Sequence, residues 1–517
     1  MSIQIFVFMN SNEYYYDENL ESGHLKSYLS KKGVETSLKY INTDKFDKYE
    51  QEINLDAVLY AFALTETNIN YVFNAITLLK QKNRLAKVCV FDTFASYNWK
   101  NILHDNKEID FIPFGNSYET IYDAYVKIKD GCLISDNSNE NLLISPEDKQ
   151  HKYIKNDFFN YTWANRDNLK SRNVIIAHLI SSYGCPSRCA FCTMPQIDNS
   201  LSYRDVEDVF NEIIYLYNKY KIRFFHFNDA TFEGVGEKGK ERMEKLCNLL
   251  ISYPIKFSFR CFVRAGSFVN EEDEKYLRLL KKAGFNNIFV GIESGCDEDL
   301  LVYNKRSELQ DNERFMMLCD KCGITPFYGF VMIQPYSTVD SVNKNYRFLI
   351  KYRSDQLSHY INCLQIYSNT PIFLKVKADN LIYDDYDYKN HPYQYSCDNT
   401  MVNDMKRFLE ENFYNDSDLQ KLNSSYHNFI FLQNYMSTIG VNDENVDKKS
   451  KIIEESIFEL CKEFFFYLYV EQDIEICEKK VKEFLQNIKE IYILVQPLKE
   501  KLLKIYLEEQ ILNEAAK

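Results

Sequence analysis

The fold is decided by the stretch Tyr183-Gly184-Cys185-Pro186-Ser187-Arg188-Cys189-Ala190-Phe191-Cys192. Its three cysteines are separated by gaps of three and two residues, and they follow directly on an apolar run that is typical of a β-strand. Three thiolates from one tight loop can each bind one iron of a [4Fe–4S] cubane and leave the fourth iron open for an external ligand. A structural zinc site normally takes four protein ligands, often from paired Cys-x2-Cys units, and the sequence has no second pair nearby. The motif therefore predicts an iron–sulfur cluster on Cys185, Cys189 and Cys192.

The residues after this motif alternate between apolar runs typical of strands and amphipathic runs typical of helices. We expect strands at 174–181, 224–228, 256–261, 287–292, 326–333 and 360–366. We expect helices at 206–219, 239–252, 271–283 and 312–322. A series of six such β/α units predicts a barrel-like parallel sheet, a partial (β/α)6 barrel, whose chemistry lies at the carboxyl ends of the strands.

The N-terminal 130 residues show a second strand–helix alternation, which predicts an open, doubly wound parallel sheet with helices on both faces. Its strands are expected at 3–8, 34–41, 55–64, 86–91 and 109–113, and its helices at 20–32, 68–82 and 118–129. From about residue 400 the strand signal fades, and the segments 404–411 and 450–516 show helical spacing. We therefore predict an α/β protein with four parts: a doubly wound domain at 1–130, a polar linker at 131–172, a barrel at 173–385 and a mostly helical domain at 386–517.

Composition narrows the classes of function. The chain has 517 residues, a formal net charge of −13 and no apolar run long enough for a membrane span, so neither a nucleic-acid partner nor a membrane is expected. The opening apolar segment lacks a basic start and a cleavage site, so it is not a signal peptide, and we expect the cytoplasm. Fourteen cysteines in such a chain do not indicate a disulfide scaffold.

The cysteine motif, with an aromatic residue before its third cysteine, resembles the signature of the radical S-adenosylmethionine (SAM) superfamily. Other segments resemble later parts of that family in the same order and at similar spacing: Phe227-Asn228-Asp229-Ala230-Thr231-Phe232, Phe259-Arg260 with Arg264, Gly291-Ile292-Glu293-Ser294-Gly295, Asn304-Lys305 and Ser368-Asn369-Thr370-Pro371-Ile372. The sequence departs from the family after the fifth predicted strand, where Gln334-Pro335 replaces the usual Pro-Gly. The resemblance covers about 173–385.

This resemblance implies a mechanism and a set of cofactor contacts. The open iron of the cluster would chelate SAM, and one electron would cleave SAM to a 5′-deoxyadenosyl radical that abstracts hydrogen from a substrate. The cofactor supplies this chemistry, and the protein positions the reacting groups and excludes water from the site. The resemblance assigns Asp229, Arg260, Glu293 and Ser294 to SAM binding, and it assigns no catalytic residue beyond the cluster ligands. It also implies a reducing partner such as flavodoxin or ferredoxin.

Residues 1–130 resemble the B12-binding-like domain that precedes the barrel in one branch of this superfamily, with the best match at 109–120. Two features depart from that branch. No Asp-x-His-x-x-Gly follows the first strand, and the strand ending at Phe91-Asp92 lacks the usual Gly-Gly pair, which would let a cofactor approach the main chain. Whether cobalamin binds is therefore left open. We interpret His24, near the start of the first helix, as a solvated surface histidine and not as a cobalt ligand.

The sequence thus predicts a radical SAM enzyme that abstracts hydrogen from a peptide or small-molecule substrate of natural-product type. Two alternatives stay open. One is a cobalamin-dependent radical SAM methyltransferase, which would also yield S-adenosylhomocysteine. The other is a non-catalytic iron–sulfur or SAM-binding protein, against which the matches around Asp229, Arg260 and Glu293 argue.

Overall fold

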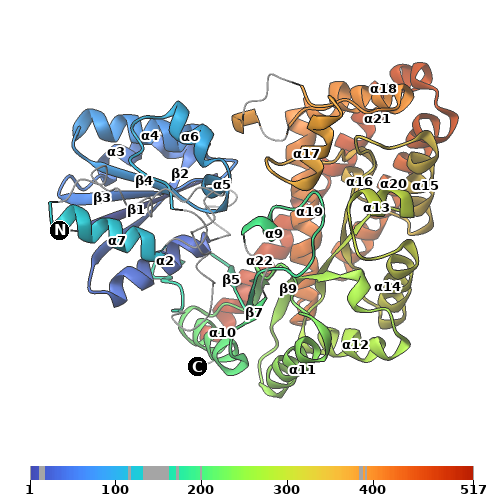
Figure 1. Ribbon diagram of the computed structural model, residues 1–517. Helices are drawn as coiled ribbons and strands as arrows, with labels where there is room; N and C mark the ends of the chain where they lie inside the picture. Colours follow the sequence, from blue (N-terminus) through green and yellow to red (C-terminus); the bar gives the residue numbers. More distant parts are fainter. Residues whose placement is uncertain are drawn as a thin grey trace. The chain divides into compact units, whose positions relative to one another are not determined.

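The computed structural model describes residues 2–10, 18–113, 118–131, 162–169, 174–197, 201–383, 388–390 and 393–515. The chain forms two compact units, both drawn in Figure 1. The first consists of Met1–Pro186, Met194–Ile222 and Tyr386–Pro392. The second consists of Ser187–Thr193, Arg223–Asp385 and Tyr393–Lys517. Most of the predicted linker, 132–161 and 170–172, lies outside the described residues.

The first unit is built on a parallel sheet with the strand order β2-β1-β3-β4. Its strands are β1 (Ser2–Met9), β2 (Glu35–Asn42), β3 (Ala57–Ala63) and β4 (Lys87–Phe91). Every residue of β1 is buried, which is why this inner strand is apolar except at Ser2 and Gln4. The fifth expected strand, at 109–113, is reduced to a single parallel bridge between Phe111 and Cys89.

Helices cover both faces of this sheet. One face packs on α2 (Leu20–Lys31) and α7 (Tyr118–Lys129) through Leu25, Leu29 and Ile121. The opposite face packs on α3 (Tyr49–Glu52), α4 (Ile69–Lys82), α5 (Thr93–Tyr97) and α6 (Trp99–Asp105). The doubly wound architecture predicted from the sequence is therefore confirmed. The same unit also contains β5 (Ile176–Leu179), β6 (Ser182–Tyr183), α9 (Met194–Ile197), β7 (Ser202–Tyr203) and α10 (Val206–Tyr220).

The second unit contains four parallel strands in the order β11-β10-β9-β8. These are β8 (Phe224–Phe227), β9 (Ser258–Arg264), β10 (Asn287–Glu293) and β11 (Phe327–Phe330). Side chains alternate between the two faces along each strand: in β9 Phe259, Cys261 and Val263 are fully covered, whereas Arg260, Phe262 and Arg264 are only partly covered. The covered face stacks Phe227, Phe259 and Phe285 against one another.

Helices alternate with these strands as expected: α11 (Gly236–Ser252), α12 (Glu274–Ala283), α13 (Asp297–Val302), α14 (Leu309–Cys322), α15 (Val339–Lys351), α16 (Leu357–Ile361) and α17 (Pro371–Ala378). The expectation of a full strand at 360–366 is wrong. Residues 357–361 form α16, and only a parallel bridge between Ile333 and Cys363 remains. Three backbone hydrogen bonds join the two segments: the Met332 and Ile333 amides donate to the Asn362 carbonyl, and the Leu364 amide donates to the Ile333 carbonyl.

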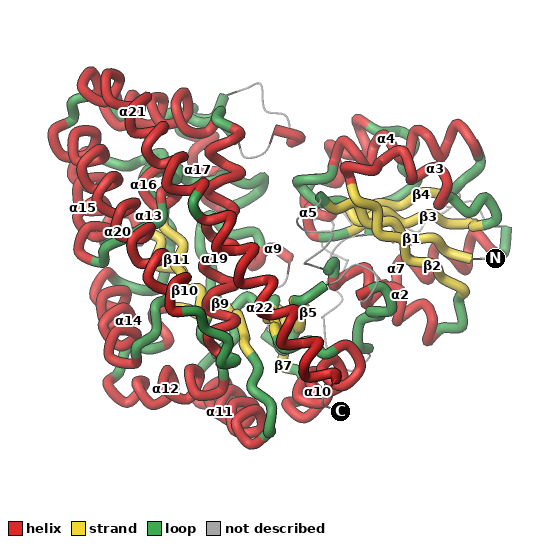
Figure 2. The backbone as a smooth tube through the Cα atoms, turned by 180° about the vertical axis from the view of Figure 1, so that it is seen from behind, coloured by secondary structure: helices red, strands yellow, loops and turns green. Residues whose placement is uncertain are grey.

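The C-terminal part is helical, as predicted. It contains α18 (Thr400–Leu409), a π-helical turn (Glu410–Tyr414), α19 (Ser417–Thr438), α20 (Glu444–Phe466), a second π-helical turn (Tyr467–Glu471), α21 (Ile474–Ile493) and α22 (Val495–Ala515). Figure 2 shows α19 and α22 side by side. Both pack on the sheet of the second unit, because Phe224 stacks on Tyr435 of α19 at 5.1 Å and on Tyr506 of α22 at 5.0 Å.

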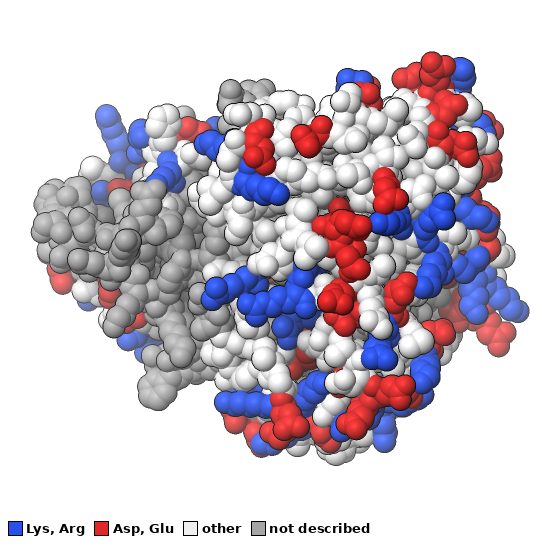
Figure 3. All heavy atoms as spheres, turned by 45° about the vertical axis from the view of Figure 1, so that its right-hand side comes forward, with Lys and Arg blue, Asp and Glu red and all other residues white. Residues whose placement is uncertain are grey.

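Surface charge is mixed on the face that Figure 3 shows, where acidic and basic side chains are interspersed. Ion pairs such as Lys344–Glu298, at 2.8 Å, and Lys351–Glu313, at 2.6 Å, join neighbouring helices of the second unit. Across the described part of the chain, the structure has no helix of the length and apolar character that a membrane crossing requires.

Candidate active site

The cysteine motif forms a loop directly after β6. Gly184, at φ 82°, adopts the left-handed conformation that lets the chain turn there. Cys185 is 9% exposed, and Cys189 and Cys192 are half-buried. None of the three forms a disulfide, and the Cys192 amide donates to the Cys189 carbonyl at 3.2 Å. The loop therefore offers three unoxidised sulfur ligands within eight residues.

Three hydrogen bonds anchor the second half of this loop. The Ala190 amide donates to the Tyr303 carbonyl at 2.7 Å, and the Ala190 carbonyl accepts from the Ile372 amide at 3.0 Å. The Asn304 side-chain amide donates to the Arg188 carbonyl at 2.7 Å. The structure thus joins the cysteine loop to two segments, 304–305 and 368–372, that the sequence picked out only by resemblance.

The carboxyl end of β10 carries an ion pair. Glu293 adopts a left-handed conformation at φ 65°, and its Oε1 lies 2.8 Å from Lys305 Nζ. The same Nζ donates to the Gly291 carbonyl at 2.6 Å. Lys305 follows directly on Asn304, so one short segment holds both the cysteine loop and the Glu293 carboxylate.

A pair of glycines makes room for this ion pair. Gly291 of β10 and Gly329 of β11 are partners in the sheet register. A Cβ added at Gly291 would stand 2.4 Å from Glu293 Oε1 and 2.5 Å from Lys305 Nζ, and one at Gly329 would stand 3.0 Å from Glu293 Oε2. The two glycines therefore form the surface against which Glu293 folds back, and a side chain at Gly291 would displace Glu293 Oε1 and Lys305 Nζ.

The carboxyl ends of β8 and β9 bring further charged groups to the same edge. Arg264, the last residue of β9, donates from Nε to Thr231 at 3.1 Å and to Glu233 at 3.0 Å. Asp229 lies two residues beyond β8 and is 1% exposed. Since the carboxyl ends of parallel strands share one edge, Asp229, Arg264 and Glu293 all belong to it.

Arg260 lies elsewhere. The strand register pairs it with Asn287, the first residue of β10, whereas Glu293 is the last residue of that strand. Its guanidinium lies over the ring of Phe431 in α19, with 4.2 Å between the guanidinium carbon and the ring centroid. Arg260 therefore lies four residues before the carboxyl end of β9, and Arg264, on the same face of that strand, is the arginine at the carboxyl edge.

Ser294 is fully buried in a polar network behind Glu293. Its hydroxyl lies 2.8 Å from the side-chain oxygen of Asn345 and 3.1 Å from Asp299, and it accepts from the Cys296 amide at 3.1 Å. Burial raises the pKa of Asp299 above its ordinary value. The Ser294 hydroxyl thus binds protein groups, and it shapes the turn after β10 from within.

The donor set of the cysteine loop fits a cubane cluster. Within the described residues, no three His, Cys, Asp or Glu side chains converge to hold one metal ion. A [4Fe–4S] cluster does not require such convergence, because each thiolate binds its own iron. Three cysteines outside any disulfide, in an anchored loop, match this requirement, and Cys185, Cys189 and Cys192 are the residues that would hold the cluster.

The described residues of the first unit fit cobalamin less well. Asp92, directly after β4, has φ 100° and ψ 166°, a conformation that is essentially restricted to glycine. Its carboxylate caps α5 by accepting from the Thr93 amide at 2.6 Å. The backbone after β4 therefore makes a turn of the kind that glycine adopts, but the residue at this turn carries a carboxylate side chain. Residues 114–117 of the matched segment 109–120 lie outside the described residues.

The interpretation of His24 as a surface residue is wrong. Its side chain is buried, with the whole residue 2% exposed, and Nδ1 lies 2.8 Å from the Thr162 carbonyl, which accepts. Burial lowers the pKa of His24 to about 4, so the imidazole is neutral at pH 7. The sequence could not show this because the covering residue is 138 positions away.

Comparisons with known proteins agree with this geometry. Residues 179–349 match the model of the radical SAM superfamily. An anaerobic magnesium-protoporphyrin IX monomethyl ester cyclase from Rubrivivax gelatinosus is 24% identical over 172 residues, 33% of this chain and 30% of that protein. A 4′-phospho-dehydrooxetanocin synthase from Priestia megaterium is 29% identical over 191 residues, 33% of this chain and 25% of that protein. The chain thus matches only about a third of the length of these curated relatives or less.

The fold extends the likeness over the whole chain. The cobalamin-dependent SAM radical enzyme OxsB, solved with aqua-cobalamin, superposes with a TM-score of 0.71 at 17% identity, covering 99% of this chain and 81% of that one. The radical SAM methyltransferase TsrM from Kitasatospora setae superposes with a TM-score of 0.60 at 15% identity, covering 73% and 76%. Residues 179–349 therefore match the domain of the radical SAM superfamily, and the chain shares its fold with solved cobalamin-dependent enzymes of that kind.

Proposed function

We propose that the chain binds a [4Fe–4S] cluster on Cys185, Cys189 and Cys192 and uses it to cleave SAM, so that hydrogen is abstracted from a peptide or small-molecule substrate. When bound, the cluster and SAM together supply the electron transfer and the 5′-deoxyadenosyl radical. The observation that carries the proposal is the anchoring of the loop: Ala190 and Arg188 are bound by Tyr303, Asn304 and Ile372. A loop fixed at both peptide groups of Ala190 holds its flanking thiols in place.

The carboxyl edge of the sheet provides groups that suit the polar parts of SAM. Glu293 is a hydrogen-bond acceptor held over the Gly291–Gly329 floor by Lys305, and it suits ribose hydroxyl groups. Arg264 offers a guanidinium at the same edge, and Asp229 a carboxylate. In this proposal Asp229, Arg264 and Glu293 contact SAM. Arg260 and Ser294, which the resemblance also assigned to SAM, act instead on the packing of α19 and on the turn after β10.

The test begins with anaerobic purification and cluster reconstitution. The wild-type chain is expected to bind about four irons and four sulfides. It should then form 5′-deoxyadenosine from SAM under reduction by dithionite or a flavodoxin. Replacing any one of the three motif cysteines with alanine should abolish both properties. Cys247→Ala is the matched control, since Cys247 is a buried free thiol on α11 far along the chain from the motif. SAM cleavage by a motif variant that holds no iron would refute the proposal.

A second candidate is cobalamin-dependent radical methyl transfer. The observation that favours it is the likeness of fold over 99% of the chain to an enzyme solved with aqua-cobalamin. Asp92 on the edge of the first sheet argues against it. The two candidates differ in cofactor content and in products. Stoichiometric cobalt after incubation with hydroxocobalamin and desalting, with S-adenosylhomocysteine formed beside 5′-deoxyadenosine, would establish methyl transfer. No SAM turnover at all would indicate a non-catalytic iron–sulfur protein.

A further inference from the structure

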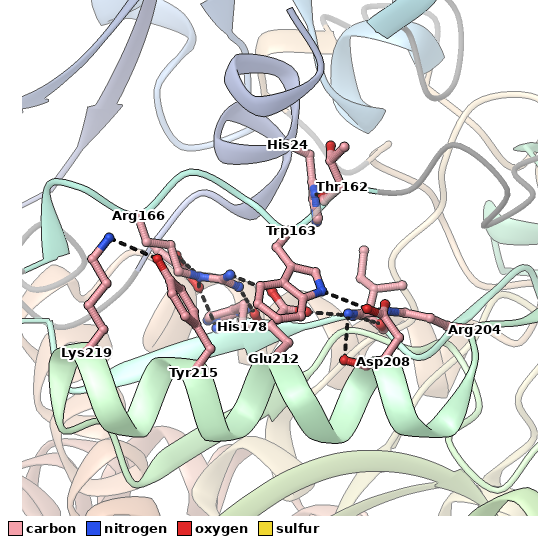
Figure 4. Close-up of polar contacts among 12 residues, drawn as sticks. His24, Thr162, Trp163, Arg166, His178, Arg204, Asp208, Glu212, Tyr215 and Lys219 are labelled. Carbon is pink, nitrogen blue, oxygen red and sulfur yellow. Dashed lines mark hydrogen bonds and ion pairs between the residues drawn. The ribbon is translucent and has the colours of Figure 1, made fainter. Parts of the chain in front are cut away.

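A buried ion network lies in the first unit and is drawn in Figure 4. We define it by Glu18, Arg166, Arg204 and Glu212. Arg166 binds both carboxylate oxygens of Glu18 at 3.1 Å and one oxygen of Glu212 at 2.6 Å. The other oxygen of Glu212 accepts from Arg204 at 2.6 Å. Glu212 therefore bridges two arginines, and Arg204 also pairs with Asp208 at 2.5 Å.

Water has almost no access to this network. The side chains of Arg166, Glu18, Glu212 and Arg204 are 2%, 3%, 0% and 1% exposed. Placing four charges in such surroundings carries a desolvation cost that apolar side chains of similar volume would avoid. Ion pairs differ from apolar packing in that their geometry is directional. The network therefore fixes the relative positions of its side chains, at the cost of their desolvation.

The network holds the main chain of β5. The His178 amide donates to Glu18 at 2.6 Å, and the His178 carbonyl accepts from Arg166 at 2.5 Å. In a parallel strand the amide and carbonyl of one residue face the same neighbouring strand. Glu18 and Arg166 therefore take the place of a neighbouring strand along this side of β5, although they come from segments 148 positions apart.

The network also holds the main chain that leads into the cysteine loop. The Arg204 side chain donates to the Ile180 carbonyl at 3.2 Å, and its amide donates to the Ser181 carbonyl at 3.0 Å. Tyr203 and Ser202 of β7 pair with Ser182 and Tyr183 of β6. Gly184 and Cys185 follow at once. Arg204 thus holds the backbone five and four residues before the first thiol of the motif.

From these contacts we infer that Arg166 is a positioning residue of the cluster site. It lies outside the matched domain, 179–349, yet it fixes Arg204 through Glu212 and so sets the place of the Cys185 thiolate. The inference rests on the proposed function, since it assumes that Cys185 binds the cluster. The inference also includes Glu18: the N-terminal segment that carries it supports Arg166 and is needed to place the Cys185 thiolate correctly.

The test uses the reconstituted full chain and the variant Arg166→Gln, which leaves Glu18 and Glu212 without their shared cation. Loss of a residue that supports a metal ligand typically costs about 10–100-fold in metal affinity. We therefore expect iron to pass from the cluster to a chelator about tenfold faster than in the wild type. The electron paramagnetic resonance spectrum of the reduced cluster with SAM should also change.

The matched control is Asp273→Asn, which breaks a partly buried ion pair, with Lys240, in the second unit. It should lower thermal stability but leave the iron-loss rate and the spectrum unchanged. If Arg166→Gln does not fold, Glu18→Gln serves instead, because it keeps an acceptor for the His178 amide and should change both readouts in the same direction by less. Wild-type spectra and iron-loss rates in the folded variant overturn the inference. A wild-type chain that binds no cluster overturns the proposed function and this inference together.

Discussion

At the residue scale, the Glu293 carboxylate depends on the absence of a side chain beneath it. Alanine at Gly291 would place a methyl group 2.4 Å from Glu293 Oε1 and 2.5 Å from Lys305 Nζ, closer than van der Waals contact allows. We expect Gly291→Ala to displace the ion pair and to weaken SAM binding on the order of tenfold, about 1.4 kcal/mol. Calorimetric titration of SAM into the reconstituted protein measures this.

Gly266→Ala is the control for that substitution. A Cβ at Gly266 would meet its nearest neighbour, Ser307 Cβ, at 3.5 Å, which is an ordinary contact. This variant should bind SAM as the wild type does. Equal SAM affinity for Gly291→Ala and wild type would show that Glu293 takes no part in SAM binding.

Also at the residue scale, His359 makes stability depend on pH. Its Nε2 lies 2.9 Å from the Tyr328 carbonyl, which can only accept, so Nε2 carries the proton and Nδ1 accepts from the Ser354 hydroxyl at 2.7 Å. Burial lowers the pKa of His359 from 6.5 to about 3. Below pH 6.5 the unfolded chain takes up a proton that the folded chain refuses, so this histidine lowers the free energy of unfolding as the pH falls towards 3.

The measurement is the free energy of unfolding in urea between pH 7 and pH 4.5. In His359→Gln the side chain cannot take up a proton, and the loss of stability with falling pH should be shallower than in the wild type by up to about 1.4 kcal/mol per pH unit. Identical slopes for the two proteins would mean that His359 titrates normally in the folded chain.

At the scale of elements, the turn from β4 into α5 combines a strained backbone with a helix cap. A non-glycine residue in the conformation of Asp92 costs on the order of 1–3 kcal/mol, whereas replacing an aspartate cap with glycine costs only a few tenths. We therefore expect Asp92→Gly to raise the free energy of unfolding by about 1 kcal/mol. Chemical denaturation of both proteins measures the change.

Asp92→Ala is the matched variant. It keeps a Cβ in the strained conformation and loses the acceptor for the Thr93 amide, so it should be less stable than the wild type by about 1 kcal/mol. If Asp92→Gly also proved less stable than the wild type, the stabilisation by the carboxylate would exceed the free-energy cost of the strained backbone. The acid would then be a stabilising part of this edge.

Local patterns predicted most strands and helices at this scale, because period and length decide whether a buried segment is a strand or a helix. They failed where an element depends on distant partners. The segment around Cys363 has a strand-like composition, but it pairs with its neighbour only through the single bridge between Ile333 and Cys363. The helix α19 was not expected, because it packs on both the sheet and α22 and so lacks one clear apolar stripe.

The cluster ligands stay a prediction from the sequence, whereas the positions of the other site residues along their strands could not be predicted from it. The spacing of the three cysteines carries the cluster prediction within a few residues of sequence. The choice between Arg260 and Arg264 depends on which strand residues share an edge, and only the pairing of Arg260 with Asn287 reveals it. The roles of Glu18 and Arg166 depend on contacts across 148 positions, for which a single sequence holds no signal.

At the scale of the whole molecule, the C-terminal helices are part of the second unit's core and not an appendage to it. Phe224, the first residue of β8, is covered by Tyr435 of α19 and Tyr506 of α22. Tyr506 is 4% exposed, whereas its neighbour Leu507 is 54% exposed. The sheet that carries Asp229, Arg264 and Glu293 is thus closed at its other end by residues from the end of the chain.

Tyr506→Ala should therefore destabilise the sheet from a position far from the cysteine loop. Truncation of a buried aromatic side chain costs about 3–5 kcal/mol, whereas an exposed leucine truncated to alanine changes stability by about 0.5 kcal/mol or less. Because the helices and the sheet share one core, loss of helical ellipticity and loss of cluster absorbance should occur at the same denaturant concentration, lower in Tyr506→Ala than in Leu507→Ala. If the cluster signal survived after the helical signal had gone, the helices would be a separate folding unit, and the cluster site would not depend on them.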